Sequence, residues 1–338
     1  MTKILVTGGA GYIGSHTCLE LLHEGYEVIV LDNLSNSSEE SLNRVQELAQ
    51  KKLVFVRGDI RNEDQLDQIF QDHQIGAVIH FAGLKAVGES QQIPLTYFDQ
   101  NIAGSLQLAK AMEKAKVFPL VFSSSATVYG ELNASPYQED MTLSLPNNNY
   151  GYTKLITEQL LQKVSLADVR WSIALLRYFN PVGAHKSGRI GEDPQGIPNN
   201  LMPYVTQVAV GRHEKLFIFG NDYPTEDGTC ERDFIHVVDL AKAHVLAVKN
   251  RLQSSGCRAW NIGTGRSISV LKIKETFEKI NGVSIPTEFV DRRAGDLAGF
   301  YADASRAKQE LGWTPQYSLE DMLADSWNWQ KLNPNGYN

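Results

Sequence analysis

A tyrosine and a lysine four residues apart, Tyr150 and Lys154, are the residues of this sequence most suited to acid–base chemistry. Residues at this spacing share one face of a helix. A phenol has an ordinary pKa of about 10, and a neighbouring ammonium lowers that pKa toward the working range of a general base. Tyr152 lies two residues from Lys154 and would point elsewhere. Ordinary amphipathic helices carry the same spacing, so the pair is a hypothesis that the surrounding elements must support.

The composition restricts the partners and the compartment. A net charge of −7 argues against a general binder of nucleic acid or of anionic membranes, because both require a basic face. Three well-separated cysteines and eight histidines show no metal-binding spacing, so we expect no metal and a reducing compartment. The start of the chain is too short for a signal-peptide core, and no apolar run approaches a membrane span. We therefore expect a cytoplasmic protein.

The first segment has the pattern of a dinucleotide-binding unit. An apolar run at 4–6 leads into glycines at 8–14 and then into a helical pattern, and a second apolar run at 27–31 ends in Asp32. Glycines in this arrangement permit a tight turn and a close approach of the backbone to a pyrophosphate. An acid at the end of the second strand accepts from a ribose 2′-hydroxyl and repels a 2′-phosphate. The pattern predicts NAD rather than NADP, although the glycines and Asp32 could serve turn geometry alone.

Strand and helix patterns then alternate along the chain, with further strand-like runs at 53–56, 77–81, 120–122 and 172–177. This alternation predicts an α/β fold with a doubly wound parallel sheet, a Rossmann domain. The loops at 180–183 and 192–200 hold much of the proline and glycine, which indicates a boundary. We expect an NAD-binding domain at 1–178, rejoined by about 233–250, and a smaller mixed α/β substrate domain at 179–338.

Several side chains follow the predicted strands. Ser125 ends the fifth strand and would share a crevice with Tyr150, where its hydroxyl can bind a sugar oxygen. Lys85 follows the fourth strand and could meet a phosphate or only solvent, whereas His80 lies inside that apolar strand and is expected to be a packed, hydrogen-bonded residue. Guanidinium groups match diphosphate oxygens, so Arg232 and the pair at 292–293 are candidate anion clamps.

Together these motifs resemble the extended short-chain dehydrogenase/reductase family, and within it the enzymes that epimerise UDP-hexoses at C4. The resemblance covers nearly the whole chain and is carried by residues 8–14, Asp32, 58–60, 123–130, Tyr150 with Lys154, 176–180, 80–90 and 220–229. It implies reversible epimerisation between UDP-galactose and UDP-glucose through a 4-keto intermediate, as part of galactose metabolism. It also implies tightly bound NAD as the cofactor, a UDP-hexose as the partner, and a homodimer built through helices of the first domain.

The resemblance also implies roles for individual residues. Catalysis would rest on Tyr150, Lys154 and Ser125. The cofactor-binding set would be Gly8, Gly11, Tyr12, Ile13, Gly14, Asp32, Asn33, Leu34, Ser35, Asn36, Ser37, Asp59, Ile60, Phe81, Ala82, Gly83, Leu84, Lys85, Gln100, Asn101, Ser125, Tyr150, Lys154 and Phe179. The substrate-binding set would be Ser125, Tyr150, Asn180, Asn200, Leu201, Phe217, Ile218, Phe219, Arg232, Arg293, Asp296 and Phe300.

Three positions depart from the family pattern. Gln100 replaces an asparagine, Ala294 replaces an acid, and Phe300 stands where a tyrosine often lines the sugar pocket. The bulky ring of Phe300 favours plain hexoses over N-acetylated ones.

Two other functions compete with this interpretation. A nucleotide-sugar 4,6-dehydratase shares the oxidation, but such enzymes usually carry an acidic pair after the hydroxyl residue of the fifth strand, where this chain has Ala126 and Thr127. A non-catalytic, NAD-sensing regulator would not need Ser125, Tyr150 and Lys154 together.

Overall fold

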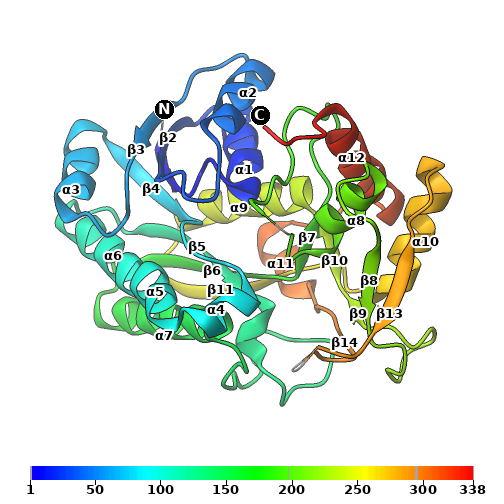
Figure 1. Cartoon of the computed structure of the whole chain (residues 1–338). Helices are drawn as coiled ribbons and strands as arrows, with labels where there is room; N and C mark the ends of the chain where they lie inside the picture. Colours follow the sequence, from blue (N-terminus) through cyan, green and yellow to red (C-terminus); the bar gives the residue numbers. More distant parts are fainter. Residues whose placement is uncertain (1, 197, 294–295, 338) are drawn as a thin grey trace.

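The computed structural model describes residues 2–196, 198–293 and 296–337, and its largest feature is a parallel sheet of seven strands (Figure 1). Their order across the sheet is β11, β6, β5, β4, β1, β2, β3. The strands are β1 (Lys3–Thr7), β2 (Glu27–Asp32), β3 (Val54–Arg57), β4 (Ile75–His80), β5 (Pro119–Ser125), β6 (Ser172–Tyr178) and β11 (Gly256–Ile262). The chain moves outward from β1 in one direction and then in the other, so the predicted doubly wound α/β fold is confirmed.

Helices cover both faces of this sheet. The helices α1 (Tyr12–His23), α2 (Glu39–Ala49) and α9 (Val237–Arg251) pack on one face. On the opposite face lie α3 (Glu63–Asp72), α6 (Gly104–Lys114) and α7 (Asn149–Ala167). Three short helical segments precede α6, namely α4 (Val87–Gln92), α5 (Pro94–Tyr97) and the π-helical η1 (Phe98–Ala103). A 3₁₀ turn, η2 (Ala126–Tyr129), follows β5.

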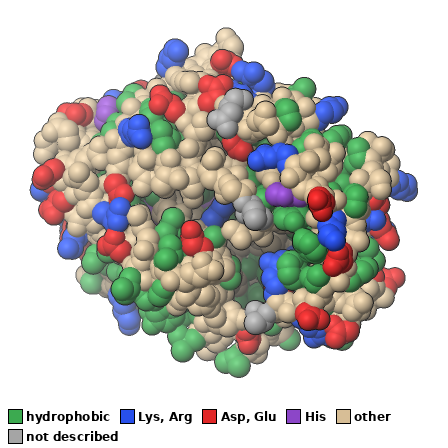
Figure 2. Space-filling view, in the orientation of Figure 1, with side chains coloured by type: hydrophobic (Ala, Val, Ile, Leu, Met, Phe, Trp, Pro, Cys, Tyr) green, Lys and Arg blue, Asp and Glu red, His purple; other side chains and the backbone are tan. Residues whose placement is uncertain are grey.

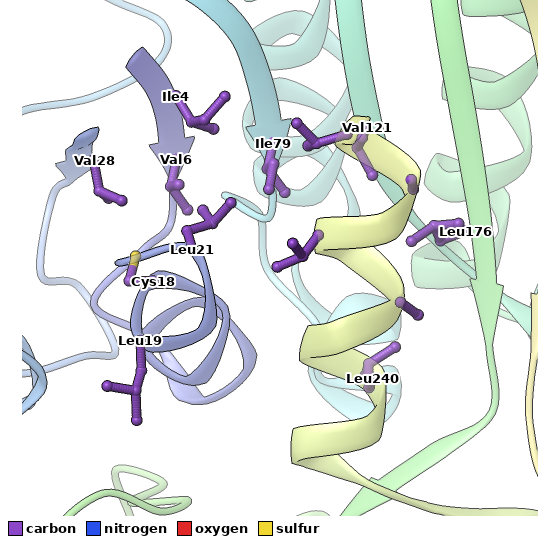
Figure 3. Close-up of a cluster of buried hydrophobic side chains, with 14 of the residues drawn as sticks. Ile4, Val6, Cys18, Leu19, Leu21, Val28, Ile79, Val121, Leu176 and Leu240 are labelled. Carbon is purple, nitrogen blue, oxygen red and sulfur yellow. The ribbon is translucent and has the colours of Figure 1, made fainter. Parts of the chain in front are cut away.

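The two cores follow from the two-residue period of a strand. In β1, Ile4 and Val6 point into the core shared with α1 and α9, whereas Leu5 points into the core shared with α3 and α6. Figure 3 shows the first core, with Val121 and Leu176 of the sheet beside α9, which carries Leu240. Because both faces are covered, the sheet is rigid and presents only its edges and strand ends to solvent.

The remaining elements form a second lobe beside the carboxyl ends of the strands (Figure 1). Its strands make three small sheets from β7 (Asn180–Val182), β8 (Leu216–Phe219), β9 (Glu231–Arg232), β10 (Phe234–His236), β12 (Ile268–Ser269), β13 (Thr287–Val290) and β14 (Gly299–Phe300). Its helices are α8 (Leu201–Ala209), α10 (Val270–Asn281) and α12 (Leu319–Leu332), whereas α11 (Ser305–Leu311) packs against α9 and β11 of the main sheet. A separate apolar cluster includes Val205, Phe277 and Leu323, from α8, α10 and α12.

The seventh strand was not predicted. β11 pairs in parallel with β6, so the main sheet extends past the segment 233–250 that was expected to rejoin it. Within the described ranges, no helix combines the length and apolar character needed to cross a bilayer.

Candidate active site

The glycine turn between β1 and α1 has no room for side chains. A Cβ added at Gly14 would lie 2.3 Å from the carbonyl oxygen of Gly8, and one added at Gly8 would lie 2.6 Å from the backbone nitrogen of Ala82. Gly8 also has a φ of +71°, which other residues rarely adopt. α1 begins at Tyr12 and Ile13 without a side-chain cap or an acid in its first turn. The turn is therefore a backbone cradle at a helix N-terminus, which fits a pyrophosphate.

Asp32 lies at the end of β2 and holds this cradle together. Its Oδ2 accepts from the backbone nitrogen of Ala10 at 3.0 Å, and its Oδ1 accepts from the nitrogen of Leu34 and the hydroxyl of Ser37, both at 2.9 Å. The carboxylate is buried. Because each carboxylate oxygen can accept about two hydrogen bonds, Oδ2 retains capacity for a ribose hydroxyl.

The loop after Asp32 and the turn after β3 lie together. Asn33 donates to Asp59 at 3.1 Å, while Ser35 and Asn36 are exposed to solvent. The guanidinium of Arg61 donates to Asp59 at 2.7 Å and holds the pKa of that carboxyl at about 2. Ile60 beside it is buried. These residues can form the wall of an adenine site.

Gln100 and Asn101 have different environments, although they are neighbours on η1. With its amide oriented to match its neighbours, Gln100 accepts from Arg61 at 2.9 Å. Asn101 is buried; its Oδ1 accepts from the nitrogen of Leu84 at 2.8 Å and its Nδ2 donates to the hydroxyl of Thr153 at 3.0 Å. Asn101 thus joins the loop after β4 to α7, whereas Gln100 lies beside Arg61, which pairs with Asp59.

The loop after β4 contains the predicted nicotinamide-side residues 81–85. His80, the last residue of β4, is buried between two hydroxyls. Its Nδ1 lies 2.7 Å from the hydroxyl of Thr7 and its Nε2 lies 2.9 Å from that of Ser105, as predicted for a packed histidine. Burial lowers the pKa of His80 to about 3, so its ring is neutral. Lys85 is exposed and donates to Glu192 at 2.9 Å, which joins this loop to the second lobe.

Tyr150, Lys154 and Ser125 meet at the carboxyl end of β5. Asn148 caps α7 by accepting from the nitrogen of Gly151 at 2.8 Å, so the helix starts just before Tyr150. Lys154 Nζ lies 5.9 Å from the centroid of the Tyr150 ring, and Ser125 lies close enough to the phenol to lower its pKa. As the spacing predicts, Tyr150 is the tyrosine that faces Lys154, whereas Tyr152 packs on Phe98.

Burial opposes the expected fall in the pKa of Tyr150. Burial raises the pKa of Tyr150 to about 12, against a hydrogen bond from Ser125 that lowers it. Lys154 is itself buried and donates to the carbonyl oxygen of Ser123 at 2.7 Å; burial lowers the pKa of Lys154 to about 8, against the charge of Glu158 that raises it. The prediction was wrong because it counted the neighbouring charge but not desolvation.

The sugar-side candidates gather on β9, β14 and the segment before β14. Arg232 donates to Asp296 at 3.2 Å and to the carbonyl oxygen of Leu297 at 2.9 Å, and it stacks 4.8 Å from the centroid of the Phe300 ring. Arg293 stacks on Phe219 at 4.1 Å. Ala294 lies outside the described residues. Figure 2 shows a hollow near the middle of this face, with Lys and Arg side chains at its edge.

The other substrate-side candidates are spread over the second lobe. Asn180 starts β7 and its backbone donates to the carbonyl of Asp233. The cofactor-side candidate Phe179 is buried, and its ring centroid lies 5.9 Å from that of Phe300. Asn200 donates to Glu192 at 2.7 Å, directly before Leu201 opens α8. In β8, Phe217 and Phe219 alternate with the buried Ile218. Phe217 is more than a third exposed and points to the same face of β8 as Phe219.

Two residues of this region were not predicted. Ser123 supplies the carbonyl that holds Lys154, and Asp233 accepts from the backbone nitrogens of Thr264, Gly265 and Ala302. The sequence signal available for Asp233 was an acid directly after the candidate clamp Arg232.

The geometry can now be set beside known proteins. The family described as NAD dependent epimerase/dehydratase matches residues 4–263. The chain belongs to this family. It is 60% identical over 334 residues to a UDP-glucose 4-epimerase of Bacillus subtilis, covering 99% of this chain and 98% of the relative. It is 53% identical over 343 residues to that of Mus musculus, covering 100% of this chain and 99% of the relative.

Solved structures of the family agree in fold. A crystal structure of UDP-glucose 4-epimerase from Bifidobacterium longum in complex with NAD+ and UDP matches with a TM-score of 0.96 and 50% identity, over 99% of this chain and 100% of that one. The predicted family and fold are thereby confirmed.

Proposed function

We propose that this chain interconverts UDP-galactose and UDP-glucose by epimerisation at C4 with tightly bound NAD, and serves galactose metabolism. The observation that carries this proposal is the meeting of Tyr150, Ser125 and Lys154 at the strand ends that also hold the glycine cradle. Relatives and solved structures named UDP-glucose 4-epimerase, matched along nearly the whole chain, support it.

The chain's own residues supply proton transfer and orientation. Tyr150, as phenolate, takes the proton of the sugar 4-hydroxyl, Ser125 hydrogen-bonds that oxygen, and the ammonium of Lys154 favours the phenolate. NAD+, held by the glycine cradle and Asp32, would supply a reversible hydride acceptor for C4 and a positive charge that also favours the phenolate. Tyr150 then returns the proton to the oxygen at C4.

Inversion requires the keto-hexose to turn between the two hydride transfers while UDP stays in place. Arg232, fixed by Asp296 and the carbonyl of Leu297, is suited to hold diphosphate oxygens. Arg293 lies on the same side of the site. The hexose would be bounded by Phe300, whose ring offers shape but no hydrogen bond, which leaves the sugar free to rotate and favours plain hexoses.

We also assign the two ligands to two parts of the chain. Residues 1–178, with β11 as a strand of the same sheet and α9 packed on it, would bind NAD, and residues 179–338 would supply most contacts to the UDP-sugar. Lys85 and Glu192, which pair across these parts, would lie between the two ligands.

A homodimer through first-domain helices is the assembly we propose. Large apolar side chains are exposed along this region, including Ile93 before α5, Leu95 on α5, which is 81% exposed, and Leu106 on α6. Exposed apolar patches mark interaction surfaces. Figure 2 shows hydrophobic side chains at the lower left, where Figure 1 places α4, α5 and α7. Light scattering should give twice the chain mass, and Leu95→Asp should reduce it.

The cytoplasm is the compartment we propose, because the cysteines Cys18, Cys230 and Cys257 are all unpaired, as in a reducing environment. Direct localisation of a tagged chain would test this.

One assay tests the proposed function. The purified protein is incubated with UDP-galactose without added NAD, and the products are separated. UDP-glucose is expected. A 4-keto-6-deoxy product would instead indicate a dehydratase, and a folded protein without turnover would favour a regulator.

A further inference from the structure

A fully buried ion pair lies beneath the proton-transfer residues and takes no part in the chemistry proposed above. Glu158 on α7 is 0% exposed and Arg177 on β6 is 2% exposed. Arg177 donates to both carboxylate oxygens, at 2.7 and 3.0 Å. Replacing such a pair by apolar side chains is often neutral or stabilising, so stability alone does not explain its presence at this place.

The carboxylate of Glu158 touches the strand that carries the active serines. The hydroxyl of Ser124 donates to Glu158. Ser124 stands between Ser123, whose carbonyl accepts from Lys154 at 2.7 Å, and Ser125, which lies beside Tyr150 and lowers the pKa of its phenol. The carboxylate of Glu158 on α7 therefore holds Ser124 in place. The neighbours of Ser124 on β5 lie against Lys154 and Tyr150, which are on the same helix as Glu158.

On the other side of the ion pair, the guanidinium of Arg177 holds the segment that follows β5. It donates to the hydroxyl of Tyr129 and to the carbonyl oxygen of Glu139, both at 3.2 Å, so it ties the segment after β5 to β6. Arg177 directly precedes Tyr178, whose hydroxyl donates to Ser123 at 2.8 Å. The pair thus joins α7, β5 and β6 at the point where each contributes to the site.

Glu158 also acts on Lys154 through its charge, because it lies one helical turn after Lys154 on α7. The charge of Glu158 raises the pKa of Lys154, against the burial that lowers it to about 8. The ionisable or polar groups around Lys154 are Tyr150 and Glu158 on α7, His80 on β4 and Ser123 on β5, whose hydroxyl accepts from Tyr178 on β6. Those around Glu158 are Lys154, Ser124, Arg177 and, on β11, Cys257. Glu158 is the one carboxylate in these two sets.

We propose that Glu158 and Arg177 are positioning residues of the proton-transfer site, with Glu158 holding Ser124 against α7 and supplying the negative charge that keeps Lys154 an ammonium. This rests on the proposed function, in which a charged Lys154 supports the phenolate of Tyr150. A merely structural pair would stabilise the fold without setting the charge of Lys154.

The test compares Glu158→Gln with the double variant Glu158→Gln/Arg177→Met, in the NAD-loaded protein. Lysine ε-carbon resonances are titrated by NMR, and Lys154 is assigned with Lys154→Met. We expect its midpoint to fall by about one pH unit or more in Glu158→Gln. In the double variant, which leaves no unpaired charge, the midpoint should lie between those of the single variant and the wild type. The alkaline limb of kcat on UDP-galactose should move in the same direction.

Ser124→Ala separates geometry from charge. It should lower kcat by about 10-fold or more while the Lys154 midpoint stays unchanged, because misplacement of reacting groups slows chemistry strongly. Ser165→Ala, a buried serine near the end of α7, is the matched control and should keep wild-type kcat.

An unchanged Lys154 midpoint in folded Glu158→Gln, or in the double variant if the single variant does not fold, would overturn the proposal. So would wild-type turnover in Ser124→Ala. A wild-type protein that does not convert UDP-galactose would instead refute the proposed function, and the NMR titration would still report on Lys154.

Discussion

The two sides of the site are held in different ways. On the side assigned to NAD, Gly14, Asp32 and Lys154 are buried, and each contacts the protein backbone directly. On the side assigned to the UDP-sugar, Arg232 has a side chain 13% exposed and Arg293 one 56% exposed, and both pair with Asp296. The first side is built from main-chain geometry, whereas the second is built from long side chains that solvent reaches.

This difference suits a cofactor that stays and a substrate that exchanges. A backbone cradle binds without losing side-chain entropy, which favours permanent occupancy, whereas arginines on a solvent-accessible wall can order around each new nucleotide. The proton-transfer residues belong to the first side, so the chemistry is fixed relative to NAD and the sugar must move.

The largest effect is expected where the two sides meet. Tyr150→Phe should lower kcat by about 10²- to 10⁴-fold, because it removes the general base. The NAD content, measured by nucleotide absorbance after denaturation, should stay close to wild type. Tyr152→Phe is the matched control, since Tyr152 packs on Phe98 and should keep full turnover. Nearly normal activity in Tyr150→Phe would refute its assignment as the base.

Breaking the backbone cradle should affect NAD rather than the sugar. Gly14→Ala places a methyl group 2.3 Å from the carbonyl of Gly8, so the turn must shift and NAD should be lost on purification. Gly88→Ala, where an added Cβ meets nothing within 4 Å, should retain the cofactor. Full NAD content in a folded Gly14→Ala protein would show that the cradle is not the binding site.

The arginines should show a graded effect on substrate binding. Arg232→Ala should raise the KM for UDP-galactose by about 10- to 100-fold, as expected for loss of hydrogen bonds to a charged group. Arg293→Ala should raise KM by less than about 10-fold, because exposed ionic contacts are weak. NAD content should change in neither variant. Equal effects, or a larger one for Arg293, would contradict the arrangement of the clamp.

The burial of Lys154 should make the free energy of unfolding depend on pH. Its folded-state pKa of about 8 lies below the unfolded value near 10.5, so the unfolded chain binds more protons between these two pH values. The free energy of unfolding of the wild type, relative to Lys154→Met, should therefore rise with pH in this window, by on the order of 3 kcal/mol at most. Denaturant titrations at pH 8 and 10.5 would measure it, and exposed Lys110→Met should show no such trend.

The sequence predicts the first side better than the second, for a physical reason. Strand periods, the glycine spacing and Asp32 are local patterns, and they place the cradle and the Tyr150 helix correctly. β11 was missed because its seven residues include Arg258 and a tryptophan rather than an apolar run, and its partner β6 lies some eighty residues earlier. The raised pKa of Tyr150 and the contact of Lys85 with Glu192 arise from tertiary burial and packing, which no local spacing encodes.

The most direct test of the account follows the hydrogen at C4. The purified protein, without added NAD, is given UDP-galactose carrying deuterium at C4, and the UDP-glucose formed is examined by mass spectrometry and NMR. Transfer to bound NAD and back predicts that deuterium is retained at C4 of the product. Replacement of the deuterium by solvent hydrogen would mean that C4 loses a proton instead of a hydride, and the account would be wrong.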